Sequence, residues 1–124
     1  MTSRAAQTYL KLAPPNPEVQ TGSTPDTNIS VQELQGHSGR DPDRPIYMAI
    51  KGIVFDVSVD PNFGQDGLFN IYTGKDASRA LGMLSMQPAD LVSDWETLTD
   101  SEKRVLDDWV MAFEKCFIIV GRVC

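Results

Sequence analysis

The stretch from Pro45 to Gly82 constrains the fold of this chain more than any other part of its 124 residues. β-Branched and aromatic side chains fill Ile46 to Val57, and this content predicts two strands joined at Lys51-Gly52. A turn at Asp60-Pro61-Asn62 follows, and then a loop broken by glycines, which leave the backbone free to fold closely against a ligand or another segment. The stretch therefore predicts a pair of core strands, a glycine-broken loop and the start of a helix.

Apolar residues at helical spacing follow the predicted strands. Between Leu68 and about Leu84 such residues recur at helical intervals, with an interruption at Thr73-Gly74. We therefore expect two short helices in this segment, which together wall one pocket.

Two capping-box signatures mark the starts of further helices. Ser30 with Glu33 predicts a short helix, and Thr99 with Glu102 predicts the longest helix of the chain. The last strand is expected over Cys116–Val123. An apolar stripe on the long helix is assigned to the core and comprises Val105, Leu106, Trp109, Val110 and Phe113.

Length and composition indicate one domain preceded by a tail. Residues 1–28 are rich in proline, glycine, serine and threonine, which predicts a flexible tail, and residues 29–124 are long enough to close a single core. The formal net charge of −6 argues against a nucleic-acid partner, because no excess of positive charge is present to neutralise phosphates. The sequence holds no apolar run of about eighteen residues or more, so we expect no membrane span.

Several short motifs resemble the haem- and steroid-binding domain of the membrane-associated progesterone receptor family. They are PIYMAIKG from Pro45, VFDV from Val54, TGKDASRALG from Thr73, DW at Asp108 and VGRV from Val120. The resemblance implies an α+β fold of the cytochrome-b5 type, in which a small mixed sheet forms the floor and short helices wall an apolar groove. It also implies a haem or steroid-like ligand and a membrane haem monooxygenase as a partner.

The resemblance also implies haem iron bound by a tyrosinate side chain, and that tyrosine belongs to the pattern Tyr-x-x-Phe-(Ala or Thr)-Gly. This chain departs from the pattern. Matched backward from Gly74, Phe69 stands at the tyrosine position and Tyr72 at the phenylalanine position. A phenyl ring cannot coordinate iron, and the polar side chains that the family often has at the positions of Phe63 and Cys116-Phe117 are replaced as well. We therefore expect no cofactor, with haem ligated by Tyr72 as the alternative.

The remaining side chains that could bind a metal ion do not indicate a metal site. His37 is the single histidine and lies in a loop, GHSG, that is typical of a solvated residue. Cys116 and Cys124 lie close to one end of the chain without a histidine beside them, and we expect both to be reduced thiols. Asp76 is expected to cap the helix that begins there.

We expect a small hydrophobic molecule to bind in the predicted groove. On this hypothesis the protein is a haem-independent relative of the family, acting beside an oxidative pathway for lipids or secondary metabolites. The alternative is an enzyme that cyclises or isomerises a polyene or polyketide-like substrate, with Tyr72 or Asp66 assisting proton transfer. The side chains predicted to contact the ligand are Phe63, Leu68, Phe69, Tyr72, Cys116 and Phe117.

The expected location follows from the same resemblance. Members of the family commonly carry an N-terminal membrane anchor, and the N-terminal residues of this sequence do not resemble one. We expect a cytoplasmic protein, or a form whose anchor has been removed. Attachment to the surface of the endoplasmic reticulum through a partner is the alternative.

Overall fold

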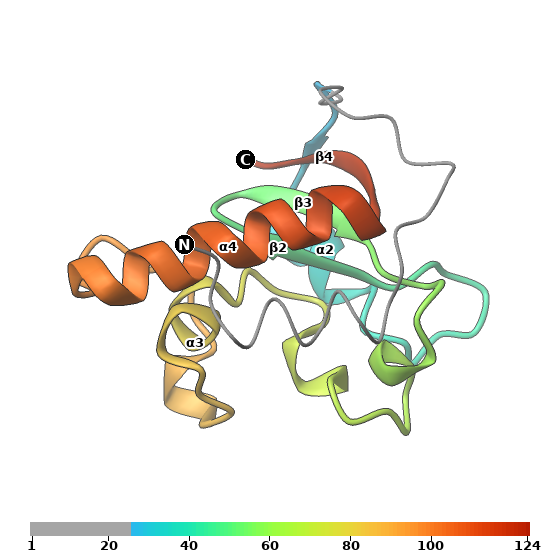
Figure 1. Cartoon of the computed structure of the whole chain (residues 1–124). Helices are drawn as coiled ribbons and strands as arrows, with labels where there is room; N and C mark the ends of the chain where they lie inside the picture. Colours follow the sequence, from blue (N-terminus) through green and yellow to red (C-terminus); the bar gives the residue numbers. More distant parts are fainter. Residues whose placement is uncertain (1–25) are drawn as a thin grey trace.

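The computed structural model describes residues 26–124, which form a four-stranded mixed sheet with short helices around it (Figure 1). The strand order is β1-β4-β3-β2. β1 (Asn28–Ile29) pairs in parallel with β4 (Ile118–Val123), whereas β3 (Ile53–Asp56) pairs antiparallel with both β4 and β2 (Tyr47–Ile50). This arrangement is the small mixed sheet with short helices that was expected from the sequence.

The two predicted core strands are confirmed as β2 and β3. Lys51 and Gly52 connect them, and both have positive φ angles, 51° and 78°, as a tight hairpin turn requires. The turn is also tied to the segment that follows, because the Lys51 N–H donates to Ser78 Oγ at 2.7 Å and the Gly52 N–H donates to an Asp76 carboxylate oxygen at 2.9 Å. These bonds fix α3 (Ser78–Met83) beside the end of the hairpin.

Both predicted capping residues lie at helix starts, and the reciprocal bonds of a capping box form at Thr99. The Ser30 hydroxyl accepts from the Glu33 N–H at 3.0 Å at the start of α2 (Val31–Gln35). At the start of α4 (Asp100–Cys116), Thr99 and Glu102 exchange bonds between side chain and backbone at 2.9 and 3.1 Å. Because α4 runs through Cys116, the last strand begins at Ile118 and not at Cys116 as expected.

The segment from Leu68 to Leu84 contains one helix and one turn, not two helices. Its first part is a single 3₁₀ turn over Asn70–Tyr72, and its second part is α3. Neighbouring loops hold this turn: the Phe69 N–H donates to the Asn62 carbonyl at 2.8 Å, and the Asn70 side chain donates to the Ser38 carbonyl at 2.9 Å. These tertiary bonds replace the intrahelical bonds that a longer helix would make.

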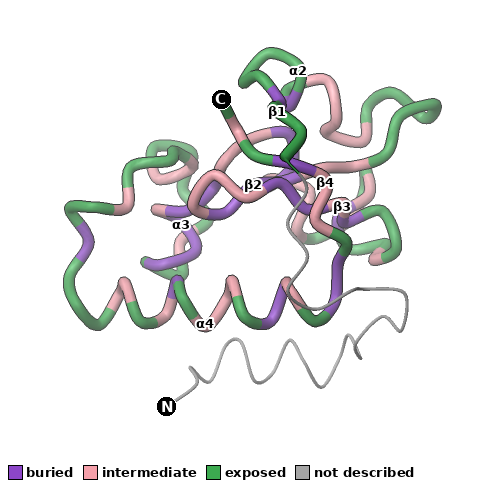
Figure 2. The backbone as a smooth tube through the Cα atoms, turned by 90° about the horizontal axis from the view of Figure 1, so that it is seen from above, coloured by how far each residue is buried: buried purple, intermediate pink, exposed green. Residues whose placement is uncertain are grey.

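The core lies between the sheet and α4, which runs along the sheet with α3 at its side (Figures 1 and 2). Phe113 of α4 stands at its centre, edge-on to Phe55 of β3 at 5.5 Å and close to Phe117 at 5.0 Å between ring centroids. α3 approaches α4 closely at Gly82, where a Cβ would lie 3.2 Å from the Glu102 carbonyl oxygen of α4. The glycine therefore sets the spacing of the two helices.

The N-terminal boundary falls close to β1. Residues 1–25, most of the expected tail, lie outside the described part of the chain. Asn28, which the sequence placed in the tail, pairs with Arg122 of β4, and the Thr27 carbonyl accepts from the Arg122 N–H at 2.8 Å. Among residues 26–124, no helix has the length and hydropathy needed to cross a bilayer.

Candidate functional site

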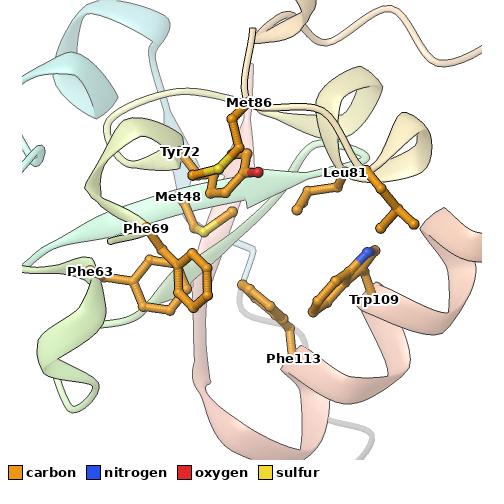
Figure 3. Close-up of a pocket in the computed structure, with 9 residues that line it drawn as sticks. Met48, Phe63, Phe69, Tyr72, Leu81, Met86, Trp109 and Phe113 are labelled. Atoms are coloured by element: carbon orange, nitrogen blue, oxygen red, sulfur yellow. The ribbon is translucent and has the colours of Figure 1, made fainter. Parts of the chain in front are cut away.

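An apolar cavity of about 170 Å³ lies between the sheet, α3 and α4 (Figure 3). β2 supplies its floor, the segment from Phe63 to Tyr72 supplies one wall, and α3 and α4 supply the others. Its most exposed lining residues are Leu84 and Met86, at 58% and 42%, and they mark the side on which the cavity meets solvent. The lining residues are Met48, Phe63, Phe69, Tyr72, Leu81, Leu84, Met86, Trp109 and Phe113.

Aromatic rings form a continuous surface around this cavity. Phe69 lies 5.7 Å from Phe63 and 6.4 Å from Tyr72 between ring centroids, and Trp109 stands edge-on to Phe113 at 6.2 Å. Rings in such arrangements stabilise one another beyond their burial. The wall is therefore preformed and apolar, which is typical of sites for small molecules.

Tyr72 is the one lining residue with a hydroxyl group. That hydroxyl bonds the loop around Ser85, at the mouth of the cavity. It donates to the Ser85 carbonyl at 3.0 Å, between Leu84 and Met86 in the chain. Burial of the ring raises the pKa of Tyr72 above its ordinary value. The phenol is therefore a neutral hydrogen-bond donor at physiological pH.

Three of the predicted ligand-binding residues line the cavity, and three do not. Phe63, Phe69 and Tyr72 are lining residues, as expected. Leu68 is 69% exposed and lies outside the lining, since the turn that follows directs Phe69 inward. The prediction was also wrong for Cys116 and Phe117, which do not line the cavity. They are 3% and 1% exposed and belong to the core behind the cavity wall.

Other lining residues were not predicted from the sequence. Trp109 and Phe113 were assigned to the core stripe of α4, but their rings face the cavity in Figure 3. Their spacing of four residues, which places them on one helix face, is a signal that could have found them. Leu81 and Leu84 belong to the helical pattern that was expected to wall a pocket, although they were not named as ligand contacts. Met48 and Met86 carry no motif that separates them from ordinary core or surface residues.

The two candidate proton-transfer groups lie in different surroundings. Asp66 is exposed and is not among the residues that line the cavity, so its carboxylate is not aimed at a molecule bound there. Tyr72 is at the cavity, but its hydroxyl is engaged with Ser85. The structure thus does not bring the two predicted groups together.

His37 has a structural role outside the cavity. Its Nδ1 lies 2.8 Å from the Pro45 carbonyl oxygen, and its ring stacks on Tyr47 with 4.1 Å between centroids. It lies in a loop, as expected, and is half-buried by these contacts. Within residues 26–124, no group of three or more histidine, cysteine, aspartate or glutamate side chains is placed to hold a metal ion.

Asp76 joins the hairpin turn to α3. Its carboxylate accepts from the backbone N–H of Ser78 at 3.0 Å and from that of Gly52 at 2.9 Å. Asp76 was expected to cap the helix, but the N-cap of α3 is Ala77, so Asp76 bonds the first helical N–H from one residue before the cap. Burial raises the pKa of Asp76, although the hydrogen bonds from Ser78 and Gly52 act in the opposite direction. The carboxylate positions one wall of the cavity and does not line it.

The donor set of the cavity does not fit haem. Iron needs an axial ligand, and Phe69, at the position of the family's tyrosine, offers none. The remaining candidate donors are the neutral Tyr72 hydroxyl, already bonded to Ser85, and the thioethers of Met48 and Met86. Lysine, arginine and histidine are absent from the described lining, so no cation there would pair with a haem carboxylate.

Comparisons with known proteins agree with this architecture. No family model matches the sequence. The chain is 43% identical over 96 residues to "Probable steroid-binding protein 3" of Arabidopsis thaliana, covering 77% of this chain and 96% of that protein. It is 42% identical over 96 residues to "Membrane steroid-binding protein 2" of Oryza sativa subsp. japonica, again covering 77% of this chain.

The match to the rice protein covers 36% of its length, so this chain spans about a third of that relative. A solved structure from Arabidopsis thaliana, described as having a cytochrome b5-like fold, superposes with a TM-score of 0.72. It is 42% identical, and the match covers 78% of this chain and 90% of the other. The expected cytochrome-b5-like fold is thereby confirmed.

Proposed function

Because the chain belongs to the membrane-associated progesterone receptor family of steroid-binding proteins, we propose that it binds a small hydrophobic molecule in the cavity between β2, α3 and α4. The observation that carries the proposal is the lining itself, which consists of aromatic, leucine and methionine side chains with a single hydroxyl. Relatives are named for steroid binding, and within residues 26–124 this cavity offers a site where an apolar molecule would be removed from water.

The expected affinity follows from the buried area. Apolar surface contributes about 25 cal/mol per Å², so a ligand that buries about 200 Å² gains about 5 kcal/mol. Association and ordering costs reduce that gain. Dissociation constants in the range of about 0.3 to 1 mM are therefore expected for simple hydrocarbon probes, and a natural ligand with matched polar contacts would bind more tightly.

Binding is proposed to be independent of haem. The support is the donor set, since Phe69 has no ligand atom and the Tyr72 hydroxyl is neutral and occupied. An apolar ligand makes no demand for iron coordination or for a buried cation. Haem ligated by Tyr72 would require that hydroxyl to leave Ser85 and to lose its proton.

A reaction in the cavity remains the alternative hypothesis. Cyclisation or isomerisation of a polyene would gain from orientation alone, but proton transfer would depend on Tyr72, the one titratable side chain among the lining residues. Burial keeps that phenol protonated, so it can donate a proton and not accept one. Binding needs no such group, and the lining therefore favours binding over catalysis.

The family resemblance extends the proposal to a partner and a place. A role beside an oxidative pathway for lipids or secondary metabolites would have the protein deliver or hold an apolar molecule near a membrane haem monooxygenase. In that arrangement the protein would be cytoplasmic and would reach the endoplasmic reticulum through its partner. Co-purification with a microsomal monooxygenase, lost when the cavity is filled by mutation, is the result expected.

Matched leucine variants test binding at the cavity. Leu81 is a lining residue and Leu68 is exposed outside it, so Leu81→Phe should weaken naphthalene binding at least tenfold while Leu68→Phe leaves it unchanged. Calorimetric titration gives the affinities, and thermal melts show whether each variant folds. Undiminished binding by a folded Leu81→Phe protein would place the site elsewhere.

A further inference from the structure

The size of the cavity limits what it can hold. Its volume of about 170 Å³ is close to that of an engineered apolar cavity of about 150 Å³ that takes up benzene. Sites for drug-sized ligands generally measure about 300–1,000 Å³ and bury most of the ligand surface. A four-ring steroid would leave much of its surface outside this cavity.

The inner walls give little room for expansion. Met48, Phe63 and Phe113 are 0%, 2% and 2% exposed, so the floor and the deep walls are backed by packed core. Behind them Phe117 lies 5.8 Å from Phe63 and 5.0 Å from Phe113 between ring centroids. A larger molecule could not push deeper without separating these rings.

The loop at the mouth is held by several hydrogen bonds centred on Ser85. Its backbone N–H donates to the Ala80 carbonyl at 2.8 Å, its hydroxyl donates to the Asp90 carboxylate at 2.6 Å, and its carbonyl accepts from Tyr72 at 3.0 Å. Leu84, at the helix end, adopts a left-handed backbone with φ of 53°. Because these bonds fix the backbone on both sides of the mouth, widening it would break more than one of them.

We propose that this site selects compact apolar molecules of one or two rings and excludes the four-ring steroid skeleton. The inference rests on the proposed binding function and adds the class of ligand. Selection comes from the packed floor and the tied mouth, which together hold the volume near its present value.

Calorimetric titration with toluene, naphthalene and progesterone tests the size limit, with the protein in the syringe because the probes are sparingly soluble. Toluene and naphthalene should bind at one site, and progesterone should bind at least tenfold more weakly than naphthalene although it is the larger apolar molecule. Equal or tighter binding of progesterone would overturn the size limit and leave the proposed binding function standing. Failure of all three probes to bind would overturn both.

An enlarging variant tests the cause of the selection. Phe69 is a half-buried lining residue, so Phe69→Ala should raise the affinity for progesterone relative to naphthalene at least tenfold. The adjacent Leu68→Ala, at an exposed position outside the lining, is the matched control and should leave the ratio unchanged. If Phe69→Ala does not fold, Leu84→Ala opens the mouth from an exposed position and carries the same expectation. An unchanged ratio in a folded enlarging variant would show that volume does not set the selection.

Discussion

The Tyr72 hydroxyl connects the cavity wall to the loop that borders its mouth. Tyr72→Phe keeps the ring and removes the bond to the Ser85 carbonyl. We expect a loss of about 1 kcal/mol in the free energy of unfolding, together with faster amide hydrogen exchange in residues 84–87. Urea unfolding and exchange measured by mass spectrometry check the two effects. Unchanged exchange in this loop would show that the bond does not hold it closed.

Asp76 makes stability depend on pH in an unusual direction. Its folded pKa is raised, mainly by burial, above the value of about 3.9 for an unperturbed aspartate. The folded protein therefore binds this proton more tightly than the unfolded chain does, and the associated stability is present below about pH 4 and lost as pH rises through the folded pKa. Relative to the Asp76→Asn variant, the wild-type protein should therefore lose unfolding free energy as the pH rises from about 4 through the folded pKa of Asp76.

Denaturant unfolding of both proteins across the acid range measures the difference, and an NMR titration of the Asp76 carboxyl gives its pKa directly. A wild type that instead gains stability relative to Asp76→Asn as pH rises would contradict the expectation. It would show that the hydrogen bonds from Ser78 and Gly52 outweigh burial.

Single residues show where sequence reasoning succeeds at this site and where it stops. Phe69 and Tyr72, which line the cavity, were singled out because the family pattern that ends at Gly74 fixes their spacing, and Phe63 because the family often has a tyrosine at that position. Leu68 was misplaced, since its neighbour's bond to Asn62 decides which side chain of the loop points inward, and that bond joins residues seven positions apart. The role of Phe113 depends on which face of α4 meets the cavity, and a stripe of apolar residues does not distinguish core from lining.

At the level of secondary structure, the elements with local chemical signals were predictable. The hairpin of β2 and β3 follows from β-branched residues around Lys51-Gly52, and α4 follows from its capping box. The turn over Asn70–Tyr72 was predicted as a helix, because its apolar spacing is helical while the bonds that shorten it come from distant loops. β1 lacks a local signal, since two residues gain a strand conformation only by pairing with β4.

The capping box of α4 can be tested with a matched pair of substitutions. Thr99→Ala removes the side chain that accepts from the Glu102 N–H, and we expect a loss of about 1 kcal/mol in unfolding free energy. Ser101→Ala, in the exposed first turn of the same helix, should cost less. Urea denaturation compares the two. Equal losses would mean that tertiary packing, and not the cap, fixes the start of this cavity-wall helix.

At the scale of the whole molecule, we expect the purified protein to lack haem colour. Protein expressed with ample haem should show no stoichiometric absorbance band near about 400 nm, because Phe69 offers no iron ligand, the Tyr72 hydroxyl is bonded to Ser85, and the described lining holds no cation for a haem carboxylate. Phe69→Tyr restores the hydroxyl that the family pattern has and should raise haem uptake, while Leu68→Tyr, at an exposed position, should not. A stoichiometric band in the wild type that disappears in Tyr72→Phe would identify Tyr72 as an iron ligand and contradict the proposal.

Entry of an apolar molecule into the cavity can be observed directly at the methionine methyl groups. Met48 and Met86 are lining residues, whereas Met111 is 52% exposed on α4 and outside the lining. In a ¹³C-methyl methionine spectrum recorded during a naphthalene titration, the resonances of Met48 and Met86 should shift with one common dissociation constant while that of Met111 stays in place. Shifts at Met111 without shifts at Met48, or no saturable shift at all, would contradict the claim.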